Sequence, residues 1–258
     1  MNISDIANGM RANALLYGSN SATSSVGGSA AASAITKAFE QADKRVQQQR
    51  DVTSAQLSSF GQLKSSFSDV QGAAKALGNL KTDATAADLG KAASAFVTAF
   101  NSAVKSAQSS QTQATTVSET TSARRAGTDL RQTIGNNSSL TLGLNKIGIT
   151  QQADGSLALD STKFQAAVQA EPAALRATVT QLGQQGQAFA ARELADTGNV
   201  GSTLKALDSR SRSLQARQTE QQSALASLQA SANSQANAYG NRVATGLAAY
   251  NNIFANAY

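Results

Sequence analysis

The 258-residue sequence contains no cysteine, histidine or tryptophan and a single proline, Pro172. Without cysteine the chain can form no disulfide, thiolate nucleophile or cysteine-ligated metal site. Without histidine it lacks the usual acid/base group at neutral pH and the commonest metal ligand. No glycine-rich phosphate-binding motif or calcium-binding loop is present, and the carboxylates are spread evenly. We therefore expect a protein that is not an enzyme and has no cofactor or metal ion.

Targeting and membrane-spanning features are also missing. Residues 1–10 have no basic start followed by an apolar stretch, and no run approaches the roughly 18 apolar residues of a membrane span. We expect a soluble protein with no membrane partner, whose export would use a route other than a cleaved signal.

Large apolar side chains are scarce. Alanine alone accounts for 51 residues, whereas Leu, Ile, Val and Phe together make up just under a fifth of the chain. So low a share indicates disorder only when the net charge is also high, and here it is +6. Because alanine and glutamine are strong helix formers, the composition predicts long helices with thin apolar seams and no thick globular core.

The basic balance, with a pI near 9.7, raises nucleic acid as a partner. However, the densest basic spots, at residues 44–45, 124–125 and 210–217, are not interleaved with aromatic residues as in a base-stacking surface. We interpret them as solvated helix faces and expect no nucleic-acid partner. A basic helical protein that binds nucleic acid or a membrane surface is the alternative from a different class.

Heptad repeats of apolar residues occur at both ends of the chain. They predict coiled-coil helices over 34–80 and 200–258 that pair antiparallel and leave apolar faces to join subunits. Each repeat has a polar middle, Gln49/Thr53/Gln56 and Ser211/Gln218/Gln221, of the kind that fixes register. After Tyr239 the spacing changes to Val243, Leu247, Tyr250, Phe254 and Tyr258. The residues assigned to the self-association seam are Phe39, Val46, Phe60, Leu63, Phe67, Val70, Leu77, Leu204, Leu207, Leu214, Leu225 and Leu228.

The rest of the chain predicts a flexible arm and a small central unit, giving a mainly α fold with one small α+β part. Residues 1–33 are rich in Ser, Gly, Ala and Asn, which favours a flexible arm. Residues 92–199 form a small helical domain, in which the polar tract 106–122 predicts a loop. Within it, Asp-Gly between two short β-type runs predicts a hairpin at 147–159. The hairpin residues are Ile149, Asp154, Gly155, Leu157 and Leu159.

Three blocks of this sequence resemble the flagellar hook-associated protein 2 family, the filament cap proteins. The first lies in 45–77 and includes QLSSFGQLKS, and the second is FVTAFN at 96–101. The third and most specific joins IGIT at 147–150, DGSLALD at 154–160, Lys163-Phe164 and Glu171-Pro172. Their order and spacing agree with the family over roughly residues 40–235. The family normally carries large β-rich domains before the second block, where this chain has only 78–95, so it resembles a short form.

The resemblance implies a structural protein of the bacterial flagellum that serves cell motility. Such a protein is secreted unfolded through the flagellar type III system and forms a homo-oligomer, generally a pentamer, at the filament tip. There it promotes flagellin folding and insertion. Its implied partners are copies of itself, flagellin, the hook-associated junction proteins and a flagellar export chaperone. The alternative within the same class is another axial or accessory flagellar coiled-coil protein, either a junction protein or a flagellin-like subunit.

Overall fold

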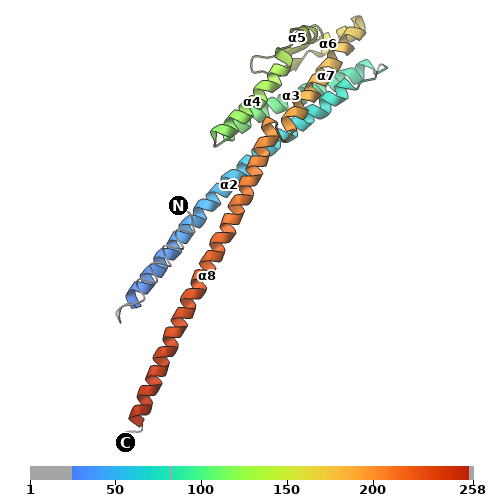
Figure 1. Cartoon of the computed structure of the whole chain (residues 1–258). Helices are drawn as coiled ribbons and strands as arrows, with labels where there is room; N and C mark the ends of the chain where they lie inside the picture. The colour runs from blue at the N-terminus through green and yellow to red at the C-terminus, as the bar shows by residue number, and fades with distance from the viewer. Residues whose placement is uncertain (1–24, 82, 256–258) are drawn as a thin grey trace. The chain divides into compact units, whose positions relative to one another are not determined.

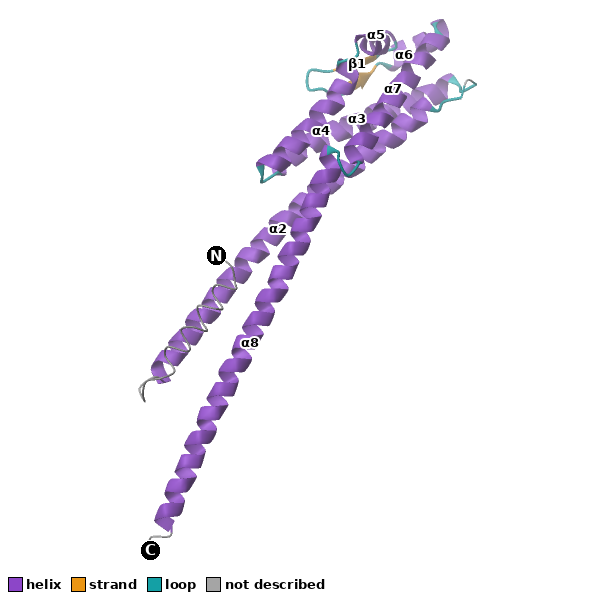
Figure 2. Ribbon diagram, in the orientation of Figure 1, coloured by secondary structure: helices purple, strands orange, loops and turns teal. Residues whose placement is uncertain are grey.

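The computed structural model describes residues 25–81 and 83–255 (Figure 1). The predicted mainly α fold with long helices and one small hairpin is confirmed (Figure 2). The elements are α2 (Ser25–Gly78), α3 (Ala86–Gln113), α4 (Val117–Gly135), α5 (Ser138–Lys146), β1 (Ile149–Gln151), β2 (Leu157–Leu159), α6 (Ser161–Ala170), α7 (Pro172–Leu194) and α8 (Asn199–Ala255).

The chain divides into two units, which we call the compact unit and the terminal unit. The compact unit is residues 48–216, and the terminal unit combines residues 1–47 with 217–258. The segments 48–80 and 200–216, expected as parts of the terminal coiled coil, therefore belong to the compact unit. Both α2 and α8 contribute residues to each unit.

Two helix boundaries differ from the sequence-based expectation. Helix α2 begins at Ser25, inside the segment 1–33 expected as an arm, while residues 1–24 lie outside the described residues. The predicted loop at 106–122 is wrong, because α3 continues to Gln113 and α4 already begins at Val117. In the part of this tract that continues α3, the small residues Ala107 and Ser110 form the buried face, while Gln108, Gln111 and Thr112 are exposed.

The core of the compact unit lies along the second half of α2. Phe60, Leu63 and Phe67 are almost fully buried and belong to one cluster with residues of α3, α4, α7 and the hairpin. The Phe67 ring packs against Phe189 of α7 with its centroid 5.6 Å away. On the neighbouring side, Ser59 Oγ donates to Ser110 Oγ of α3 at 3.0 Å. This part of α2 is thus a central element of a multi-helix bundle.

Helices α2 and α7 approach each other closely through glycine. A Cβ atom added to Gly183 would lie 2.5 Å from Gly78 N and 2.6 Å from Ala74 O, both backbone atoms of α2. Backbone atoms cannot move aside as a flexible side chain can, so only glycine fits at position 183. The close approach lets a chain with few large side chains still pack without voids.

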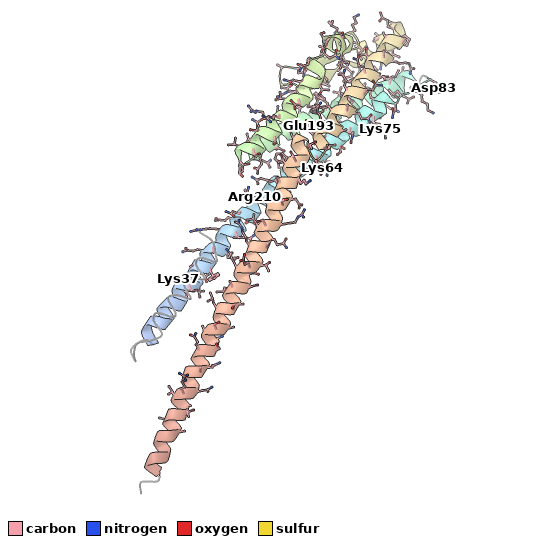
Figure 3. The ribbon with its side chains drawn as sticks, in the orientation of Figure 1. Lys37, Lys64, Lys75, Asp83, Glu193 and Arg210 are labelled. Carbon is pink, nitrogen blue, oxygen red and sulfur yellow. The ribbon has the colours of Figure 1, made fainter. Side chains whose placement is uncertain are left out.

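The turn between α7 and α8 is held by a buried acidic residue. Glu193, labelled in Figure 3, is 2% exposed, and its Oε2 atom accepts a hydrogen bond of 2.9 Å from Asn199 Nδ2. Asn199 is the first residue of α8, so this bond fixes where α8 starts relative to the end of α7. By contrast, Lys64 and Lys75 lie on the exposed side of α2 (Figure 3).

We predict that Gly183→Ala destabilises the protein by about 1–3 kcal/mol, because the added methyl group forces α2 and α7 apart. The matched control is Gly72→Ala on α2, where an added Cβ meets nothing within 4 Å. That change should stabilise the helix by roughly 0.5–1 kcal/mol. Urea unfolding followed by circular dichroism measures both; equal effects of the two changes would contradict the close α2–α7 contact.

Candidate functional site

The predicted hairpin is present, with strands β1 and β2 paired antiparallel so that Ile149 faces Leu159 and Gln151 faces Leu157. Ile149 and Leu157 are 1% and 3% exposed and belong to the core of the compact unit, while Leu159 is partly buried against it. The hairpin is therefore a structural part of this unit with one buried face, as the alternating sequence predicts.

The turn of the hairpin uses the predicted Asp-Gly pair. Asp154 Oδ1 accepts hydrogen bonds from the Ser156 backbone N–H at 2.9 Å and the Ser156 hydroxyl at 2.7 Å. These two donors, the hydroxyl first, lower the pKa of the Asp154 carboxyl. Gly155 has φ +86°, and an added Cβ would lie 1.9 Å from Arg131 Cδ. The positive φ therefore favours glycine here, whereas the flexible Arg131 side chain can move aside.

An amide side chain from α3 holds the hairpin edge in place. Asn101 Nδ2 donates to Leu157 O at 2.8 Å, and Leu157 N donates to Asn101 Oδ1 at 2.7 Å. The Asn101 amide thus makes the two backbone hydrogen bonds that a neighbouring strand would make with Leu157. Just after β2, Asp160 caps α6 through a 3.0 Å bond from Lys163 N, and Pro172 occupies the first turn of α7.

The predicted seam residues fall into two groups. Most lie in the compact unit, where they are buried or partly buried within the chain itself, namely Phe60, Leu63, Phe67, Val70, Leu77, Leu204, Leu207 and Leu214. The others lie in the terminal unit. There Val46 is buried, Phe39 and Leu225 are partly buried, and Leu228 is 37% exposed. Surface that could meet another subunit is thus found among the seam residues of the terminal unit.

One predicted polar layer leads to a buried carboxylate that the sequence interpretation missed. Gln56 is 2% exposed, and its Nε2 atom donates to Glu119 Oε2 of α4 at 2.7 Å and to Thr115 Oγ1. Glu119 Oε2 also accepts from the backbone N–H groups of Thr115 and Thr116 at 3.2 and 3.3 Å. Arg210 Nη1 of α8 lies 3.9 Å from Glu119 Oε1. Glu119 therefore joins α2, α4 and α8.

The remaining polar positions serve other purposes. Thr53 Oγ1 donates to Gln49 O of its own helix at 2.7 Å, while the Gln49 side chain is exposed. In the terminal unit, Gln218 Nε2 lies 3.5 Å from Asp43 Oδ1, which pairs α8 with α2. The sequence did contain a signal for Glu119, because Thr116-x-x-Glu119 is a capping box.

A second missed residue is Arg176 of α7. Its Nη1 and Nη2 atoms donate to Lys81 O at 2.8 Å and Ala84 O at 2.7 Å, so one guanidinium holds both sides of the connection between α2 and α3. Helix α3 then starts with a capping box formed by Thr85 and Asp88.

The cavities of the described residues hold few groups suited to catalysis. An open groove of about 830 Å³ follows α3, and its walls carry one carboxylate, Asp69, and one ammonium group, Lys91. Among residues 25–81 and 83–255, no group of three or more acidic side chains could hold a metal ion. In the same residues, no helix is apolar over enough of its length to cross a bilayer.

The described residues thus form a helical scaffold with one hairpin held by Asn101 and a buried polar junction at Glu119. The family model for the flagellar hook-associated protein 2 C-terminus matches residues 70–252, about seven tenths of the chain. The chain therefore belongs to the flagellar hook-associated protein 2 family, a family of structural flagellar proteins. No curated protein and no solved structure matches the chain.

We predict that Glu119→Gln destabilises the protein by about 1–3 kcal/mol. The carboxylate accepts hydrogen bonds from Gln56 and from two backbone N–H groups, and a neutral amide in its place accepts these bonds less well. Denaturant unfolding gives the free energy of unfolding. The control is Glu171→Gln, an exposed residue whose side chain caps no helix, where a change within about 0.5 kcal/mol is expected. A similar loss in both variants would show that Glu119 does not join the helices as described.

We also predict that the Asp154 carboxyl titrates below the ordinary aspartate range. Because its pKa is lowered in the folded state, the stabilising turn contact is present at neutral pH. This stabilising contact is lost as the pH falls from about 4, the ordinary aspartate pKa, down through the lowered pKa of Asp154. Carboxyl carbon shifts measured by NMR against pH report the pKa directly. Ser156→Ala removes the main donor and should raise the pKa; an unchanged titration would refute this cause.

Proposed function

We propose that this protein is a filament-cap-like assembly component that self-associates at the tip of the flagellar filament. There it would promote the folding and insertion of flagellin. The observation that carries the proposal is the family match over residues 70–252. This range includes the hairpin, Asn101, which hydrogen-bonds to strand β2, and all helices from α3 to α7.

The two units suit different tasks in this proposal. The compact unit has its apolar seam buried within the chain and its hairpin pinned to α3, so it serves as a rigid body. The terminal unit has most of its residues from 225 onward exposed, so it is the part we assign to subunit contacts. Of the predicted seam, Phe39, Leu225 and Leu228 remain our candidates there, whereas Val46 is already buried within the chain.

The proposed partners follow from a place at the filament tip. They are further copies of this chain, flagellin, the hook-associated junction proteins and an export chaperone, with delivery through the flagellar type III channel. The short connection between Gly78 and Ala86 supports a related possibility. A protein with so little chain at this point could be another axial component, such as a junction or flagellin-like subunit.

We predict that the purified protein forms closed rings of uniform size in negative-stain electron microscopy. A cap stops growing when its ring closes, whereas a flagellin-like subunit continues to add into filaments. Filaments of variable length would therefore support the flagellin-like alternative and contradict the cap. A strictly monomeric protein at all concentrations would refute both. Binding to DNA or anionic vesicles at low salt would instead favour the basic-helix alternative.

A further inference from the structure

The last part of α8 has an apolar stripe with no described partner. Val243 and Leu247 are 70% and 62% exposed, although both are large apolar side chains. They lie one helical turn apart, and the sequence continues the same stripe through Tyr250 and Phe254. Single exposed apolar residues are common, but a continuous stripe of them marks an interaction surface.

The register of the terminal unit shows why α2 leaves this stripe uncovered. Within the terminal unit, α2 runs toward the compact unit, which it enters after residue 47. Helix α8 runs away from the compact unit from residue 217 onward, so the two helices are antiparallel. Gln218 pairs with Asp43. From Asp43 the described helix α2 extends eighteen residues to Ser25, and eighteen residues from Gln218 lead to position 236. Residues 237–255 of α8, roughly 28 Å of helix, therefore have no described α2 residue opposite them.

The charge distribution singles out the same segment. Of all Lys, Arg, Asp and Glu residues in the chain, only Arg242 lies after Glu220. Arg242 is about a quarter turn to the side of the Val243 position, so its head group can stay in water beside the stripe. In a symmetric bundle each inward residue meets its own copies, and identical charges there would repel one another. A stripe without charge is suited to this arrangement.

The spacing of the stripe also differs from the heptads before it. Tyr239 and Tyr250, and likewise Val243 and Phe254, are eleven residues apart. An eleven-residue repeat corresponds to about 3.67 residues per turn, which is close to the 3.6 of a straight helix and drifts slowly toward a right-handed supercoil, opposite to the left-handed one of a heptad repeat. The segment is thus patterned for a different packing from the heptad seam of α2 and α8.

We propose that residues 237–255 of α8 dock against the same segment of further copies of this chain, as a parallel bundle of nearly straight helices. This inference rests on the proposed self-association and names the surface that brings it about. The helices are parallel because each one leaves the same end of an identical unit arranged around a closing axis. The heptad seam of the compact unit then serves the fold of each copy, and the eleven-residue stripe joins the copies beside the terminal-unit seam residues Leu225 and Leu228.

The first test compares two charge-matched double variants by sedimentation of the full chain over a range of concentrations. Val243→Asp with Leu247→Asp places two carboxylates in the stripe and should raise the concentration needed for assembly about a hundredfold or more. Asn241→Asp with Thr245→Asp places the same charges, at the same spacing, on the opposite side of the helix and should leave assembly within about threefold of the wild type.

The second test is a cross-link that does not depend on destabilising the helix. The chain has no cysteine, so Leu247→Cys introduces a single thiol. In a parallel bundle this thiol meets its own copies, and mild oxidation should give covalent dimers much faster than Thr245→Cys does. If residues 1–24 of the same chain cover the stripe instead, Leu247→Cys will be protected and will not cross-link.

The outcomes separate this inference from the proposed function. Assembly lost in the stripe variant and kept in the control, together with selective cross-linking at position 247, supports the bundle. Assembly that is unaffected by the stripe variant overturns the bundle while leaving the cap-like function intact, and so does a protected thiol in an assembled protein. A wild-type chain that never assembles overturns both.

Discussion

The structure depends on the burial of one face of α2 between Phe60 and Leu77. Large apolar side chains are few in this chain, and this face concentrates several of them in a core where α3 and α7 pack against α2. Elsewhere alanine, serine and glycine line the contacts, so helices approach closely, as Gly183 does with Ala74 and Gly78. A thin core is sufficient because backbone and small side chains fill the space that large residues fill in other proteins.

Much of this architecture could be predicted from the sequence. The heptad spacing of Phe60 and Phe67 marks a buried helix face, and Asp154-Gly155 between alternating residues marks a hairpin, since both signals are local. The helix over the tract 106–113 could not be predicted in this way, because its buried residues are alanine and serine and give no apolar period. Helix propensity extends α3 to Gln113, and the capping box of Thr116 starts the next helix, α4, four residues later.

The polar contacts of the candidate site were harder to predict for a different reason. Gln56 and Glu119 are 63 positions apart, and Asn101 and Leu157 are 56 apart, so nothing in the local sequence links them. Glu119 could be recognised as a helix cap but not as the partner of Gln56, which on heptad spacing alone belongs to a coiled-coil layer. Such residues gain their roles only when the fold brings distant segments together.

The connection between α2 and α3 has a consequence for how this family can vary. Arg176 binds the carbonyl groups of both Lys81 and Ala84, so the two ends of the connection are held by one side chain of α7. The compact unit is thereby closed at this point and its core is complete without further chain. Any polypeptide whose own ends lie near each other could be spliced in here without disturbing either helix. The connection can therefore differ in length without a change in the helices on either side of it.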